Sequence, residues 1–137
     1  MNKFNISSIL VALGLAFSGS AIAQNMSKDE HEAAEKQVAA EYKSDKAQCE
    51  SLTGNAGDIC MAQAKGKEKV AKAELEAKFK PSKEAAYNVS VAKAEANYEV
   101  SKEKCDDIAG NEKDVCEKAA KAILEQAKSE AKAKQHH

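Results

Sequence analysis

The chain has 137 residues, of which 31% are charged, and its 21 basic side chains nearly balance 22 acidic ones. Every basic residue is a lysine, so the bidentate arginine contacts that read phosphate and guanine are absent. The formal net charge of −1 and the absence of a basic run argue against nucleic-acid binding.

Residues 1–23 have the three parts of a bacterial secretory signal. Lys3 supplies the positive start, residues 6–17 form a short apolar run, and small residues end at Ala23. The run is shorter than an ordinary membrane span. We therefore expect cleavage before Gln24, export to the periplasm or the medium, and no membrane insertion of the mature chain.

Alanine, lysine and glutamate dominate the remainder, a composition that predicts long helices with narrow apolar seams. We expect a frayed leader over 24–29 and a disordered tail over 135–137. Asp58 is the expected N-cap of the second helix. Pro81 is the only proline and predicts a joint over 80–82, with a kink in one continuous helix as the alternative. The predicted helices are about 30–52, 58–79, 83–108 and 114–134.

Spacings of three and four residues give each predicted helix one seam. In the fourth helix we expect Val115, Ala119, Ala122 and Ile123 to point inward. The seams are thin for a chain of this size, so some seam residues should be available to a partner. The partner-facing candidates are Val38, Val70, Val91 and Tyr98.

Two stretches of the chain are copies, offset by 56 positions. Each holds two cysteines eleven positions apart around a Gly-Asn pair, with an aspartate two residues before the second cysteine. An even number of cysteines in a small exported chain predicts a disulfide framework. Of the three pairings we favour Cys49–Cys60 and Cys105–Cys116, because a short loop closes at least entropic cost and each copy is then self-contained. The wide spacing argues against a thiol oxidoreductase or a zinc site.

The three histidines lie near the ends of the predicted mature chain. His136 and His137 could bind copper or nickel weakly, with Met61 as a further ligand. A solvated tail or a cloning remnant is the favoured interpretation of these two residues, and His31 is likewise assigned no role. No nucleophile elbow or glycine-rich loop is present, so we assign no catalytic residue, no cofactor and no metal ligand.

The repeated pattern Tyr-x6-Cys-x4-Gly-Asn-x2-Asp-x-Cys, followed by an Ala/Lys/Glu-rich helix, covers roughly residues 38–134. It resembles a group of small exported proteins of Gram-negative bacteria, sometimes loosely labelled TolA-like cell-envelope proteins. Unlike TolA, the chain is expected to have no N-terminal membrane anchor. The resemblance implies a cell-envelope location and a hairpin architecture, and it implies no reaction.

The sequence thus predicts an all-α fold of two disulfide-pinned αα-hairpins, arranged as a four-helix bundle or an extended rod. The first hairpin repeat is assigned to 24–80 and the second to 81–137. The expected function is that of a non-catalytic, soluble periplasmic protein with a structural, binding or stress-protective role. Its partner would be an envelope protein or a second copy of the chain. The alternatives are a desiccation-type protectant or holdase, and a weak periplasmic copper or nickel binder.

Overall fold

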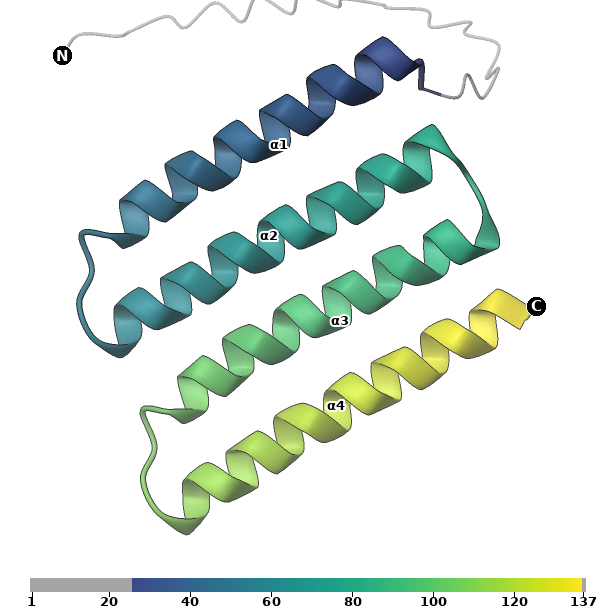
Figure 1. Cartoon of the computed structure of the whole chain (residues 1–137). Helices are drawn as coiled ribbons and strands as arrows, with labels where there is room; N and C mark the ends of the chain where they lie inside the picture. The colour runs from purple at the N-terminus through teal and green to yellow at the C-terminus, as the bar shows by residue number, and fades with distance from the viewer. Residues whose placement is uncertain (1–25, 137) are drawn as a thin grey trace, which may run out of the picture.

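The computed structural model describes residues 26–136, so the predicted signal peptide and His137 lie outside the described residues. Within 26–136 the regular structure is entirely α-helical, which confirms the predicted fold class. Each helix runs antiparallel to the next (Figure 1). The four helices are α1 (Lys28–Cys49), α2 (Asn55–Phe79), α3 (Lys83–Cys105) and α4 (Asn111–His136).

The helices lie side by side in chain order and form one open layer (Figure 1). Helix α2 packs against α1 and α3, and α3 packs against α4, whereas the described parts of α1 and α4 do not meet. The two hairpins therefore fold back against each other instead of extending as a rod. The four helices do not close around a central core. Each inner helix buries a narrow apolar seam on two opposite sides, and each outer helix buries a seam on one side only.

Two disulfides pin the two hairpins and confirm the predicted pairing. Cys49 bonds to Cys60 with the Cα atoms 5.5 Å apart, and Cys105 bonds to Cys116 with the Cα atoms 5.7 Å apart. Both bridges lie next to the turns of their hairpins, at the same end of the layer (Figure 1). Each crosslink restricts the unfolded chain, which compensates in part for the small apolar core.

Helix α1 begins two residues earlier than predicted, because a capping box forms at Ser27. The Ser27 hydroxyl accepts a hydrogen bond from the backbone N–H of Glu30 at 3.2 Å, and the Glu30 carboxylate accepts one from the backbone N–H of Ser27 at 2.8 Å. This reciprocal pairing satisfies two donors of the first turn. The expected leader over 24–29 is therefore corrected for Lys28 and Asp29, which are helical.

The turns have the predicted length but lie three residues earlier in the chain, and α2 begins at Asn55 with Gly54 as its N-cap. Asp58 was the expected cap, but its backbone N–H already donates to the Gly54 carbonyl within the first turn. Gly54 and Gly110 occupy equivalent turns and both have positive φ, at 62° and 64°. Helices α1 and α3 correspondingly end at Cys49 and Cys105, three residues before the predicted ends.

The predicted joint near Pro81 is confirmed, and the kinked continuous helix is not formed. Lys80 leaves helical geometry with φ −130° and ψ 76°. Ser82 then caps α3, since its hydroxyl accepts a hydrogen bond from the Ala85 N–H at 2.9 Å. At the other end of the second hairpin, α4 continues to His136, so the expected disordered tail is helical up to that residue.

The buried face of α4 differs from the predicted one. Val115 and Ile123 are 59% and 67% exposed, and Ala119 and Ala122 are exposed as well. Leu124 is buried in place of its neighbour Ile123, because the two side chains point about 100° apart around the helix and only one of them can face α3. The residues that share the inward face with Cys116 are Ala120, Leu124 and Ala131.

The two hairpins meet through a close contact between α2 and α3. A Cβ atom added to Gly66 would lie 2.9 Å from the Cβ of Ala96, so only glycine allows the helices to approach this closely. Asn55 fastens the same interface near the turns by donating a hydrogen bond to the Glu103 carbonyl at 2.8 Å. An ion pair between Lys93 and Glu74, 2.7 Å apart, crosses it farther along.

Candidate functional site

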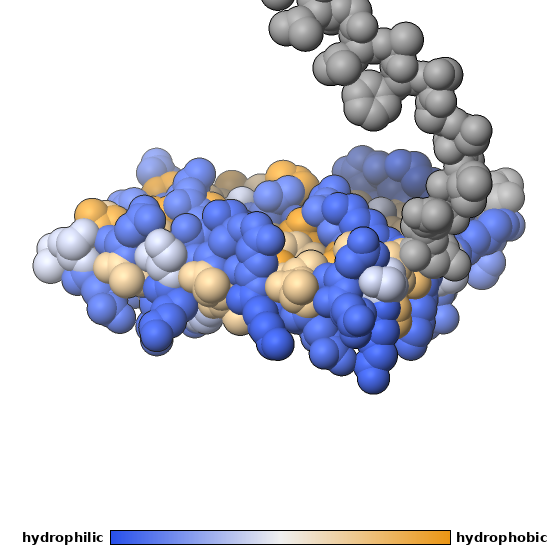
Figure 2. Space-filling model, turned by 90° about the horizontal axis from the view of Figure 1, so that it is seen from above, coloured by the Kyte–Doolittle hydropathy of each residue, from blue (hydrophilic) through white to orange (hydrophobic). Residues whose placement is uncertain are grey.

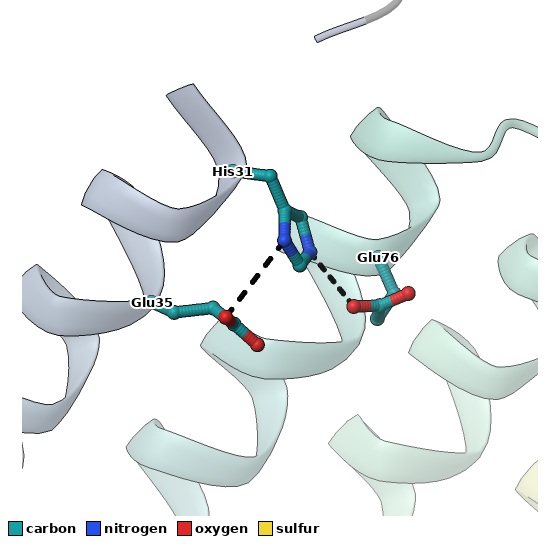
Figure 3. A group of neighbouring side chains, drawn as sticks. All are labelled: His31, Glu35 and Glu76. Carbon is teal, nitrogen blue, oxygen red and sulfur yellow. Dashed lines mark hydrogen bonds and ion pairs between the residues drawn. The ribbon is translucent and has the colours of Figure 1, made fainter. Parts of the chain in front are cut away.

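Three potential ligand groups meet where the start of α1 passes the end of α2 (Figure 3). The His31 Nε2 lies 2.8 Å from an oxygen of Glu76, and its Nδ1 lies 3.9 Å from an oxygen of Glu35. His31 is only 8% exposed and is the one buried polar residue within 26–136. The imidazole also stacks against Phe79, with ring centroids 4.3 Å apart, so packing holds the ring between the two carboxylates.

Helical geometry explains why these residues converge. His31 lies one heptad before Val38 and Glu35 lies one turn after His31, so both follow the α1 seam toward α2. The antiparallel course of α2 then brings Glu76 beside His31, although the two are 45 residues apart in the sequence. Sequence reasoning missed the cluster because it treated His31 as part of a chain end. The signal was the seven-residue spacing to Val38, which continues the seam by one heptad.

The cluster carries excess negative charge. Glu35 and Glu76 are each about half exposed, with side-chain exposures of 55% and 56%. Among residues 26–136, no lysine forms an ion pair with either carboxylate, although lysines form ion pairs with several other acidic side chains. Two carboxylates facing one imidazole form a nitrogen and oxygen donor set that suits zinc, copper or nickel. All cysteines are in disulfides, so thiolates do not contribute.

A second polar cluster consists of ion pairs that connect three helices. The Glu95 carboxylate of α3 pairs with Lys69 of α2 and with Lys128 of α4, the latter at 2.9 Å. Hydrogen bonds from these two lysines hold the pKa of Glu95 below its usual range. The bond to Glu95 in turn raises the pKa of Lys128. This bridge ties the two hairpins together at the middle of the layer.

The four partner-facing candidates are half-buried and lie in separate places. Val38 lies with Tyr42 and Ala71 in a small depression between α1 and α2. Val70 lies with Val100 in a groove of about 650 Å³ between α2 and α3. Val91 and Tyr98 are on α3. The structure therefore does not gather these residues into one surface, and their role stays a prediction.

The ligands suggested for a tail metal site are not brought together within the described residues. Met61 lies in the second turn of α2, next to the disulfide turns, and lines a groove with Ala62 and Glu99. His136 ends α4 at the opposite end of the layer (Figure 1). The terminal histidines would therefore have to act without the Met61 thioether.

Comparison with protein-family models, curated proteins and solved structures gives no match. Within residues 26–136, no helix contains a segment both long and apolar enough to cross a membrane.

Proposed function

We propose that this chain is a non-catalytic helical protein of the cell envelope that acts by binding or structural support. The observation that carries the proposal is the open layer, in which α1 and α4 each leave one side without a packed neighbour among the described residues. A single layer of helices offers two broad faces and two edges for contact. The two disulfides brace this shape at one end.

The two edges of the layer differ in character. Viewed from above, on the side of α1, the surface is mostly hydrophilic with small, separated hydrophobic patches (Figure 2). Helix α4 instead exposes large apolar side chains at Val115 and Ile123. Exposed aliphatic residues on one helix are candidates for contact with a partner. The partner would be another envelope protein or a second copy of this chain.

The proposed location rests on three supports. The first 23 residues have the pattern of a secretory signal. Two disulfides are typical of an oxidising compartment such as the periplasm. The duplicated cysteine hairpins resemble those of small exported envelope proteins.

Site-specific photo-crosslinking in cells tests the binding role. A photoreactive residue at Ile123 should give a discrete crosslinked product in the envelope fraction. The same residue at Glu125 is the matched control, because this exposed position lies about 200° around α4 from Ile123. A product of twice the chain mass would identify self-association, and a larger discrete product would identify another protein. Equal, diffuse labelling from both positions would refute a specific contact through α4.

A thermal melt followed by far-UV circular dichroism separates this proposal from the protectant alternative. A braced helical module should be strongly helical, melt cooperatively and lose stability on reduction of the disulfides. A desiccation-type protectant should show little helical signal in dilute buffer and no effect of reductant. That second outcome would replace the proposed function by the alternative.

A further inference from the structure

We infer that His31 and Glu76 bind one divalent transition-metal ion of the zinc, nickel and copper class, with Glu35 as a positioning residue. This site goes beyond the proposed function and does not depend on it. It is also distinct from the terminal histidines, because it lies between the start of α1 and the end of α2.

The distance between the two ligand atoms fits a shared ion. Metal bonds to imidazole nitrogen and carboxylate oxygen are about 2.0–2.2 Å long, so two neighbouring ligands at right angles lie roughly 3 Å apart. The His31 Nε2 and the Glu76 oxygen are already 2.8 Å apart. Only a small outward rotation of the half-exposed Glu76 would open the site. The nitrogen and oxygen donors in this arrangement suit tetragonal copper or nickel in particular.

Glu35 lies on the other side of the imidazole ring and so would act through it. A metal-bound histidine commonly donates its second N–H to a carboxylate, which fixes the tautomer and strengthens the ligand. Glu35 lies 3.9 Å from Nδ1 and is about half exposed, so a side-chain rotation would shorten this distance to a hydrogen bond. The stacking of His31 on Phe79 leaves the ring little freedom to turn away.

The internal repeat shows that the hairpin does not need these donors for its architecture. A shift of 56 positions places Tyr87, Val91 and Lys132 where the first hairpin has His31, Glu35 and Glu76. The second hairpin keeps the same two-helix packing and disulfide although it has none of these three donor residues. The first copy alone combines an imidazole with two carboxylates, which favours a ligand role over a packing role for these side chains.

The test is titration of the metal-free mature protein, with both disulfides intact, by Cu²⁺ or Ni²⁺ in a calorimeter. A His136→Ala/His137→Ala variant, which removes the tail histidines, should still bind one ion per chain. In that background His31→Tyr, which introduces the residue of the second repeat, should abolish the one-site binding. Glu35→Gln should weaken the affinity about 10- to 100-fold, as loss of such a supporting carboxylate typically does.

Two outcomes would overturn the inference. One is loss of binding in the tail variant alone, and the other is unchanged affinity in the His31→Tyr variant. Circular dichroism of each variant checks that the helices persist. Wild-type protein provides a test without substitutions, because bound Cu²⁺ broadens nearby NMR signals. Broadening should centre on residues 31, 76 and 79, and broadening confined to the end of α4 would refute the site.

Discussion

The contact between Gly66 and Ala96 should control how tightly the two hairpins associate. Gly66→Leu places a side chain where even a Cβ atom would be 2.9 Å from the Ala96 Cβ. Carbon atoms in favourable contact are about 3.5–4.0 Å apart. Ala96 has no rotatable side chain that could move aside, so the helix backbones would have to separate. No other pair of helices joins the two hairpins within 26–136.

Two opposing effects set the magnitude. Overpacking of this kind costs about 1–3 kcal/mol. Replacing a helical glycine by leucine returns about 0.8 kcal/mol through better helix propensity. The difference is a loss of up to about 2 kcal/mol in the free energy of unfolding for Gly66→Leu. For a domain of about this size, a loss of about 2 kcal/mol corresponds to a melting temperature lower by roughly 10 °C.

The assay is thermal and urea unfolding of the oxidised protein, followed by far-UV circular dichroism. Ala122→Leu is the matched control, because position 122 is equivalent to position 66 in the repeat but lies exposed on α4. This control should stay within about 0.5 kcal/mol of wild type. Equal stability of the two leucine variants would refute the role of the close contact in joining the hairpins.

Three further predictions concern the turns and the ion pairs. Removal of the first disulfide by Cys49→Ala/Cys60→Ala should lower the free energy of unfolding by about 2–3 kcal/mol, since the bridge closes a short loop; an unchanged urea midpoint would contradict this. Gly54→Ala and Gly110→Ala should each cost about 1 kcal/mol, because φ is positive at both while the space for a Cβ is open; a gain in stability would argue against backbone strain. The lowered pKa of Glu95 means that its carboxylate stabilises the fold above the usual glutamate range and ceases to do so as the pH falls through its folded-state pKa. At pH 7 Glu95→Gln should therefore cost up to about 1 kcal/mol, a difference that shrinks in acid, whereas a pH-independent difference would exclude the ion pairs as the cause.

Local chemistry made much of the fold predictable. The repeated cysteine spacing and the predicted export signal led us to expect both disulfides, and the proline with its following serine predicted the joint between the hairpins. The helix ends were less predictable because several residues could serve as caps. Gly54 displaced Asp58 from that role through its positive φ, and the capping box at Ser27 required Glu30 to be recognised as its partner.

The packing face of α4 was predicted wrongly because this alanine-rich helix offers more than one possible apolar seam. Val115 and Ile123 are larger than the alanines around them, and the hydrophobic pattern alone favours turning them inward. Leu124 competes with Ile123 for the inward position, and α4 buries Leu124 together with Ala120 and Ala131. Alanine seams give a weak directional signal, since each buried alanine removes little apolar area from water.

For a different reason, the His31 cluster was not predicted from the sequence. His31 and Glu76 are 45 residues apart in the sequence and become neighbours only through the register of α1 against α2. The sequence predicted both helices and the Cys49–Cys60 disulfide, which fixes which residues of the two antiparallel helices lie opposite each other. Placing Glu76 beside His31 requires that register to be followed from the disulfide to the open end of the hairpin.

The outer edges of the two-hairpin layer differ from the interface between the hairpins in a way that affects the addition of further molecules. Val70 and Val100 flank the Gly66–Ala96 contact, and the corresponding positions on the two outer edges hold Gln126 of α4 and Ser44 of α1. Stacked repeats need such polar outer surfaces at their ends, because an edge that copied the inner interface would recruit further molecules head to tail. At these two positions the polar side chains thus disfavour a repeat of the α2–α3 interface with a further molecule.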